Sequence, residues 1–347
     1  KDTIGFQPNQ KALTSILSVV KTNFPGVTHI AISVPLNSTG QFKQYNTIPS
    51  PLSVEAFTDM ILDTIHGMGY GVIIRGTDCS MEQIYNFPLI SQPPSYWILQ
   101  ATNWLTMHKG HLSNQDIAAF YPEADGHIYY NGSSPIDSGV HDFRADYNAF
   151  WQQLPSAIAK WGIANGLILR CHTSVNGTSI SNANYDGKTF NQVGSDKLEN
   201  SDSIHAAGGI VVDWYNYGNV PQDQASYISW YKASLDYFHS LYGSPIFVQE
   251  WGDTRGDTSG SVQKNDPSLT ANMADQVFFP LLKSGVMFGI NFWNLFATPQ
   301  EGILNSVAAD VMYLNAGGSV ALNAKGLALA DVFVKWFKNP VPVPPTS

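Results

Sequence analysis

Short apolar runs alternate with helical stretches along almost the whole chain, and this alternation restricts the folds that the chain can adopt. Seven of the eight runs are followed by a stretch with helical spacing of apolar residues. The expected strands cover residues 4–7, 27–36, 71–76, 116–123, 166–171, 209–217, 245–250 and 286–293. The expected helices cover residues 10–23, 53–67, 94–109, 142–160, 222–242, 269–283 and 325–337. Short apolar strands separated by helices predict a parallel sheet that helices cover on both faces.

Eight such units in 347 residues favour an α/β fold of the (β/α)8 TIM-barrel type over an open sheet. No glycine-rich dinucleotide motif follows the first strand and no Walker loop is present, which argues against nucleotide-binding folds. We expect one catalytic domain over residues 1–338. We expect the Pro-rich segment 339–347 to be a tail, or a linker to an appended binding module or surface anchor.

Composition narrows the classes of partner. Only 13% of the residues are charged, against a usual share of roughly 25%. The net charge is −9 and Lys and Arg do not cluster, which argues against nucleic-acid binding. No apolar run reaches the length of a membrane span. A surface built from neutral polar residues is typical of a secreted or cell-surface protein that binds neutral polar ligands, and whether Cys79 and Cys171 are bridged stays open.

Two of the six glutamates stand at the ends of expected strands. Glu123 ends the fourth strand and Glu250 ends the seventh. In a barrel the C-terminal strand ends converge on one mouth, so the two carboxyl groups are expected to face a common substrate. A pair of carboxyl groups about 5 Å apart is what retaining hydrolysis of a glycosidic bond requires.

Strand alternation extends this expectation to the neighbouring residues. It groups Ala119 and Tyr121 with Glu123 on one face of the fourth strand. It groups Ile246 and Val248 with Glu250 on one face of the seventh, so that both sets would point into the barrel.

The chain resembles the clan A retaining glycoside hydrolases, nearest to the family 5 cellulase and mannanase type, over residues 2–337. The segment Phe247-Val-Gln-Glu-Trp-Gly252 is similar to the nucleophile segment of that family. The resemblance implies that Glu123 is the acid/base and Glu250 the nucleophile of a double displacement.

Two further segments carry the resemblance. Asp213-Trp-Tyr-Asn-Tyr-Gly218 is similar to the family's His-X-Tyr segment. Tyr217 then stands where a tyrosine hydrogen-bonds the nucleophile, and Tyr215 replaces the family's histidine. Ile290-Asn-Phe-Trp-Asn-Leu295 is similar to the segment whose tryptophan lies beneath the cleaved sugar, which implies that role for Trp293.

Other positions depart from the family pattern or extend it. Pro122 replaces the asparagine that usually precedes the acid/base, and the arginine of the family's second strand has no counterpart, although Arg75 can substitute for it. Asp125 is a rival acid in the same loop as Glu123. His172 and Trp251 are further candidates for substrate contact, with a structural role as the alternative for each.

The pair His108-X-X-His111 closes an expected helix and has the spacing of two metal ligands. No third ligand accompanies it, so we expect a solvated helix end, no metal site and no cofactor.

These observations predict a secreted retaining β-glycoside hydrolase that cleaves within a β-1,4-linked polysaccharide such as cellulose, mixed-linkage glucan or mannan. A β-mannanase is an alternative. A carbohydrate-binding barrel without catalytic activity is another, because of Pro122 and the missing arginine. A metal-dependent barrel hydrolase is a third.

Overall fold

The structure is a computed structural model of the whole chain. It describes residues 10–36, 53–77, 93–120, 136–137, 141–165, 169–175, 183–185, 188–189, 210–218, 221, 223–243, 245–252, 267–292, 296–297, 311–314 and 319–338. The expected strand at residues 4–7 and the Pro-rich segment 339–347 lie outside these ranges.

Two parallel sheets form the centre of the molecule, and their strands follow one another in chain order. The first sheet has the order β1 (His29–Pro35), β2 (Gly71–Thr77), β3 (Ile117–Phe120) and β6 (Ala164–Asn165). The second has the order β12 (Met287–Phe292), β11 (Ile246–Trp251), β10 (Ile210–Gly218) and β7 (Leu169–Val175). Of the expected strand 166–171, residues 169–171 lie in β7, and β6 precedes that range in the chain.

Shorter strands extend or flank these sheets. On β7 the second sheet continues antiparallel with β8 (Ala183–Tyr185) and β9 (Lys188–Thr189). A small sheet near the C-terminal helix contains β13 (Phe296–Ala297), β14 (Met312–Leu314) and β15 (Val320–Leu322). A two-stranded ladder joins β4 (Ile136–Asp137) to β5 (His141–Asp142).

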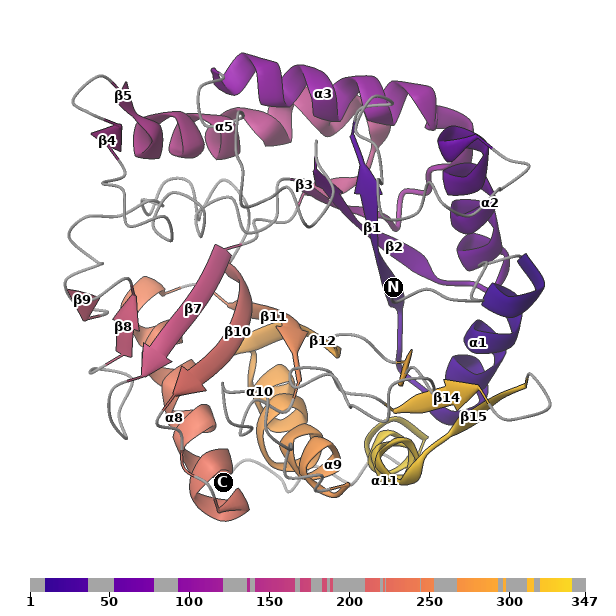
Figure 1. The fold of residues 1–347 in the computed structure, drawn as a ribbon, viewed down its shortest axis with the longest axis vertical. Helices are drawn as coiled ribbons and strands as arrows, with labels where there is room; N and C mark the ends of the chain where they lie inside the picture. Colours follow the sequence, from indigo (N-terminus) through magenta and orange to yellow (C-terminus); the bar gives the residue numbers. More distant parts are fainter. Residues whose placement is uncertain are drawn as a thin grey trace, which may run out of the picture.

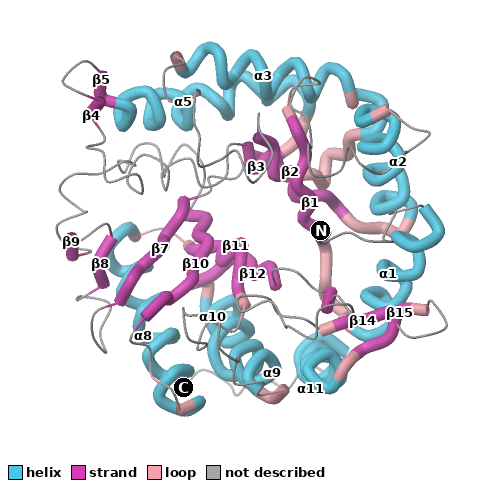
Figure 2. The backbone as a smooth tube through the Cα atoms, viewed as in Figure 1, coloured by secondary structure: helices cyan, strands magenta, loops and turns pink. Residues whose placement is uncertain are grey.

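The helices form a ring around the two parallel sheets (Figure 1, Figure 2). They are α1 (Gln10–Asn23), α2 (Val54–Gly67), α3 (Pro94–Met107), α5 (Phe143–Ile158), α8 (Gln224–Tyr242), α9 (Leu269–Met273), α10 (Phe279–Ser284) and α11 (Ala324–Phe333). A π-helical turn at Ala274–Phe278 joins α9 to α10, and another at Val334–Lys338 continues α11. Neighbouring helices pack on each other, as α1 does on α2 and α3 does on α5. This is the arrangement of an α/β barrel.

Side-chain caps set the starts of several helices. The Ser53 hydroxyl accepts a hydrogen bond from the Ala56 amide at the start of α2. The carboxylate of Asp223 and the amide oxygen of Asn323 do the same for α8 and α11. Such caps satisfy amides that have no partner within the helix. The helices that the sequence predicts are therefore confirmed to within a few residues.

The two faces of the sheets carry different side chains. Val72 and Ile74 of β2 belong to the large apolar core that the sheets share with the helices. Ile73 lies between them in sequence and packs with Ala119 and Phe247 in a second, smaller cluster. Because β-strand side chains alternate, this second cluster marks the inner face of the sheets.

The N-terminal edge of the first sheet is held by a buried carboxylate. Asp116 is fully buried, and its two oxygens accept hydrogen bonds from the amides of Val72 and Ser113. His66 of α2 contacts the same carboxylate at 2.8 Å. These partners compensate the cost of burying a charge and fix α2, β2 and the start of β3 relative to one another.

Within the described residues, the outer edges of β1 and β12 pair with no other strand, so the two sheets do not close into one barrel. None of the helices described is both long enough and apolar enough to cross a membrane.

Candidate active site at the strand ends

The described part of the chain contains one of the two expected catalytic glutamates. Glu250 is the penultimate residue of β11, and its backbone stands opposite Asp213 of β10. Glu123, its rival Asp125 and the expected platform Trp293 lie outside the described residues. Cys79 does as well, so the structure does not test a bridge to Cys171.

β11 carries a bulge directly before Glu250. Toward β10, Val248 pairs with Val212 and Glu250 pairs with Asp213, which leaves Gln249 as an extra residue. Toward β12, Val248 pairs with Ile290 and Trp251 with Phe292, so two residues of β11 face the single Asn291. The pairing of β11 with each of its two neighbouring strands therefore shows one additional residue in β11 directly after Val248. A β-bulge bends the strand and changes which way the following side chains point.

The facing predicted for the first part of this strand is wrong. Ile246 and Val248 were expected on the inner face, but both are fully buried in the core shared with the helices, and Phe247 points inward instead. The physical reason is that the apolar run 245–248 supplies a residue to each face, so an apolar side chain alone does not indicate the inner one. In β3, Ala119 does lie on the inner face as predicted, whereas Tyr121 and Glu123, which were grouped with it, lie outside the described residues.

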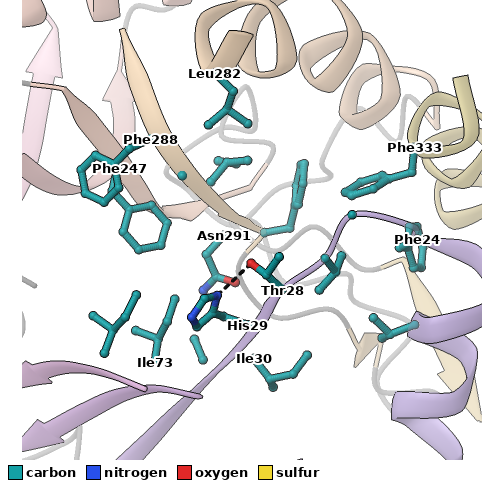
Figure 3. Close-up of a pocket in the computed structure, with 18 of the residues that line it drawn as sticks. Phe24, Thr28, His29, Ile30, Ile73, Phe247, Leu282, Phe288, Asn291 and Phe333 are labelled. Atoms are coloured by element: carbon teal, nitrogen blue, oxygen red, sulfur yellow. Dashed lines mark hydrogen bonds between the residues drawn. The ribbon is translucent and has the colours of Figure 1, made fainter. Parts of the chain in front are cut away.

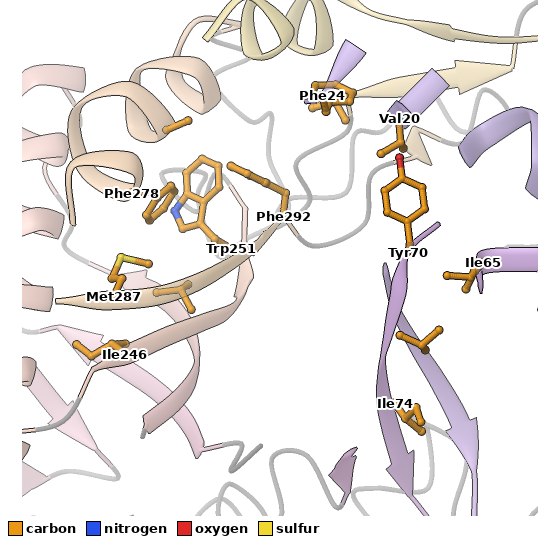
Figure 4. Close-up of a cluster of buried hydrophobic side chains, with 14 of the residues drawn as sticks. Val20, Phe24, Ile65, Tyr70, Ile74, Ile246, Trp251, Phe278, Met287 and Phe292 are labelled. Carbon is orange, nitrogen blue, oxygen red and sulfur yellow. The ribbon is translucent and has the colours of Figure 1, made fainter. Parts of the chain in front are cut away.

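Trp251 lies in the helix-facing core. Its ring is fully buried and packs edge-on against Phe278 and Phe292, at centroid distances of 5.4 and 5.8 Å (Figure 4). The structure thus gives Trp251 the structural role that was the alternative to a substrate contact, because the bulge turns its side chain away from the inner face.

A cavity of about 730 Å³ lies between β1 and β12, which do not pair with each other in the described part of the sheets (Figure 3). One wall consists of inner-face residues of the strands, including Ala31, Ile73 and Phe247. The rings of Phe247 and Phe288 are 5.5 Å apart at this wall. The other wall comes from the helices and includes Phe24, Phe279 and Phe333.

Polar residues of the inner face lie toward the C-terminal ends of the strands. Ser33 and Arg75 are paired in register and both line the cavity, as does Asn291 of β12. Arg75 is only 4% exposed. A buried guanidinium favours the ionised form of any carboxyl group placed near it. This end of the inner face therefore carries polar groups and a cation, whereas the layer of Ile73 and Phe247 below it is apolar.

The remaining expected contact residues lie on neighbouring strands of the second sheet. Tyr215 and Tyr217 are in β10, and His172 is in β7, where its backbone stands opposite Tyr215. Tyr217 stands opposite Ser174 in the same ladder. The structure thus places all three on strands adjacent to one another, one or two strands from β11.

The histidine pair at the end of α3 is not a solvated helix end. His108 is 2% exposed and its Nδ1 lies 2.6 Å from Asp59 of α2. His111 contacts Asp63 at 2.8 Å, and the hydrogen bond with that carboxylate raises the pKa of His111. The pair therefore joins α3 to α2. No group of three or more potential metal ligands occurs among the described residues.

The sequence carries only weak signals for the bulge in β11 and for the wall of the cavity. The bulge has no marker in the run Phe247-Val-Gln-Glu, because it is defined only by the registers of two neighbouring strands. Gly289 offered a clue to the cavity wall, since a side chain there would meet the ring of Phe247 at 2.8 Å.

Comparison with known proteins finds similar proteins by structure but not by sequence. No protein-family model matches the chain, and no curated protein matches its sequence. Solved structures match over nearly its whole length. A GH1 β-glucosidase from the fungus Humicola insolens covers 94% of this chain and 87% of its own, with a TM-score of 0.60 and 10% identity.

Two further structures give the same picture. A family 1 β-glucosidase from Thermotoga maritima covers 95% of this chain and 86% of its own, with a TM-score of 0.57 and 12% identity. The AHE enzyme from Alicyclobacillus herbarius covers 94% and 87%, with a TM-score of 0.57 and 11% identity. At these identities the likeness establishes an α/β barrel fold.

Proposed function

We propose that this protein is a retaining β-glycoside hydrolase in which Glu250 is the nucleophile and Glu123 the acid/base. The observation that carries the proposal is the position of Glu250 at the C-terminal end of β11, directly after the bulge at Gln249. In α/β barrels the catalytic residues come from the C-terminal ends of the strands. The fold is shared with proteins described as β-glucosidases, which favours this chemistry by analogy.

The bulge supports the orientation that the mechanism needs. Val248 faces the helices, so uninterrupted alternation would send the side chain of Glu250 the same way. One extra residue reverses the alternation beyond it, and Trp251 already shows this reversal by facing the helices three residues after Val248. A retaining mechanism requires the carboxyl group of Glu250 to face the substrate, and the bulge is the feature of β11 that permits it.

Arg75 then has a defined electrostatic role. A buried cation on the inner face lowers the pKa of a nearby carboxyl group, and a nucleophile must be ionised. Tyr217 and Tyr215 would support the same carboxylate, while His172 and Trp293 would contact the sugar. Glu123 needs the opposite environment, because an acid must hold its proton at neutral pH.

The reaction follows from these two roles. The Glu250 carboxylate forms a bond to the anomeric carbon while Glu123 transfers its proton to the departing glycosidic oxygen. Glu123, now ionised, removes a proton from water, whose oxygen attacks the anomeric carbon and breaks the ester bond to Glu250. The sugar leaves with the configuration that it had in the substrate.

The substrate proposal is a β-linked glucan or gluco-oligosaccharide, cleaved internally as an endo-β-1,4-glycanase does, with mannan as the alternative polymer. The low share of charged residues, 13%, supports a neutral ligand and a secreted or cell-surface location. Exo action would be revealed by release of glucose from aryl β-glucosides with no fall in the viscosity of a soluble polysaccharide.

The decisive experiment is to trap the intermediate. A 2-deoxy-2-fluoro β-glycoside with a good leaving group should label the protein once, and peptide mass spectrometry should place the label on Glu250. Glu250→Gln should lower kcat by at least about a thousandfold. The control is Glu55→Gln on α2 of the outer ring, which should keep full activity.

Three outcomes would contradict the proposal. A label on another carboxylate, or unchanged turnover in Glu250→Gln, would remove Glu250 from its role. Binding of polysaccharide with no hydrolysis of any glycoside would instead favour the inactive carbohydrate-binding barrel. Asp125→Asn compared with Glu123→Gln decides which of the two carboxyl groups supplies the proton.

A further inference from the structure

A row of alternating aspartate and histidine side chains joins α2 to the end of α3. Asp59 and Asp63 stand one turn apart on α2. His108 directly follows α3, and His111 ends the 3-10 turn η3 (Lys109–His111). The Nδ1 of His108 lies 2.6 Å from Oδ1 of Asp59. His111 lies between the two carboxylates, with its Nδ1 2.8 Å from Oδ1 of Asp63 and its Nε2 3.6 Å from Oδ2 of Asp59.

The position of His111 between two carboxylates favours one protonation state. A neutral imidazole carries a proton on one ring nitrogen and a lone pair on the other. Because both nitrogens of His111 face a carboxylate oxygen, a neutral ring would direct its lone pair at a negative charge. The doubly protonated ring instead presents an N–H group to each carboxylate. The geometry therefore favours the cation.

The charges around His111 act in the same direction. The hydrogen bond with Asp63 raises the pKa of His111, burial lowers it, and the negative charges of Asp59 and Asp63 raise it, so that the net shift is upward. Both carboxylates belong to α2, which packs on η3.

The other titratable groups near this row are few in the described part of the chain. Glu55 precedes Asp59 by one turn on α2, and its charge has the same sign. Lys109 belongs to the same turn as His111. His66, further along α2, has its own partner in Asp116, at 2.8 Å. The shift of His111 thus comes from its burial and from the two carboxylates of the row.

We propose that Asp59, Asp63, His108 and His111 form a proton-dependent clasp that holds the end of α3 on α2 when His111 is charged and loosens when His111 loses a proton. His108 is the permanent part of this clasp, because its ring is 2% exposed and packs 4.4 Å from the ring of Trp104 in the core. His111 is the part that responds to pH, because its side chain is accessible to solvent.

The direction of the response follows from the upward shift. A histidine whose pKa is higher in the folded protein stabilises the fold fully below its unfolded-state pKa of about 6.5. The stabilisation is lost as the pH rises through the folded-state pKa. The clasp is therefore closed in acidic solution and loosens in alkaline solution.

Loosening of the clasp should reach the start of β3. After η3 the chain runs through Ser113 to Asp116, and β3 begins at the next residue. The Asp116 carboxylate accepts hydrogen bonds from the amides of Ser113 and Val72. The clasp thus holds the segment that leads from α3 into β3.

An NMR titration of the histidine rings in the unmodified full-length protein is the first test. The ring of His111 should titrate above pH of about 6.5, and Asp63→Asn should lower its midpoint. Asp63 is more than half exposed, so this variant should fold normally. A midpoint of His111 at or below 6.5, or one that Asp63→Asn leaves in place, would overturn the proposal.

Hydrogen exchange measures the loosening itself. The amide of His108 donates to the carbonyl of Trp104 and that of His111 to the carbonyl of His108, so both report on this turn. Their protection factors, corrected for the intrinsic pH dependence of exchange, should fall about two- to fivefold between about pH 6 and about pH 9. His111→Gln should abolish this dependence.

Lys109→Gln is the matched control, because it removes a charge from the same turn and should keep the pH dependence. Protection that is independent of pH in the parent would contradict the clasp. So would an equal fall in His111→Gln, or a fall that follows the titration of His108 instead of His111. None of these measurements involves a substrate, so the clasp can fail while the proposed function stands.

Discussion

Val248 and Trp251 stand three residues apart on β11, yet both side chains are fully buried in the same helix-facing core. Regular alternation would place them on opposite faces. The extra residue at Gln249, registered independently by β10 and β12, accounts for the difference. The core thus holds the strand on both sides of the bulge, next to the proposed nucleophile.

Trp251 should therefore be a large contributor to stability. Trp251→Ala removes a buried ring that contacts Phe278 and Phe292, and it should lower the free energy of unfolding by about 3–5 kcal/mol. Urea denaturation followed by circular dichroism measures this value. Leu99→Ala on α3, where the side chain is 53% exposed, should stay within about 0.5 kcal/mol of the parent. Equal effects of the two substitutions would contradict the assigned core role.

Arg75 should control the ionisation of Glu250, the proposed nucleophile. Arg75→Met removes the buried cation, so the acidic limb of the pH profile of kcat/KM should move to higher pH and activity at neutral pH should fall by about tenfold or more. Arg75→Lys keeps the charge and should retain the position of that limb. A loss of stability in Arg75→Met without any shift of the profile would show that the residue only fills space.

Asp275 should stabilise the C-terminal helical segment in a pH-dependent way. Its carboxylate accepts hydrogen bonds from Lys335 at 2.8 Å and from the indole of Trp336 at 2.6 Å. Burial by itself raises the pKa of this carboxyl group, but these two partners outweigh burial and hold the pKa below its ordinary value. The stabilisation is consequently present above the unfolded-state pKa of about 4 and is lost as the pH falls through the folded-state pKa.

Asp275→Asn tests this dependence. At pH 7 the substitution should lower the free energy of unfolding by about 1–2 kcal/mol, and the difference from the parent should shrink at pH 2–3. Asp236→Asn is a matched control, because Asp236 pairs with Lys232 at the surface of α8 and should contribute less than about 0.5 kcal/mol. A difference for Asp275→Asn that grows toward acid pH would have the wrong sign.

Two helical glycines should respond in opposite directions to the same substitution. A Cβ at Gly326 of α11 would collide with the backbone carbonyl oxygen of Val311, so Gly326→Ala should destabilise the protein by about 1–3 kcal/mol. Gly67 of α2 has no atom within 4 Å of the corresponding position. Gly67→Ala should therefore stabilise by up to about 1 kcal/mol, because alanine favours the helix. Thermal unfolding of both variants gives the comparison.

The sequence by itself determined the order and type of the elements. Helices such as Gln10–Asn23 and strands such as Gly71–Thr77 follow from local patterns of apolar residues and from caps such as Ser53, which act within a few residues of the chain. The position of Glu250 at a strand end, on which its proposed role depends, also follows from a local pattern, namely one charged residue after an apolar run.

Only the tertiary structure decided which face each side chain of β11 occupies, and it reversed the prediction for Ile246 and Val248. It also decided that His108 is buried against Asp59, and that a cavity separates β1 from β12. The physical reason is common to these cases. Facing, burial and register depend on residues that lie far away in the chain, such as Asp213 and Asn291 beside Gln249, and local periodicity carries no information about them.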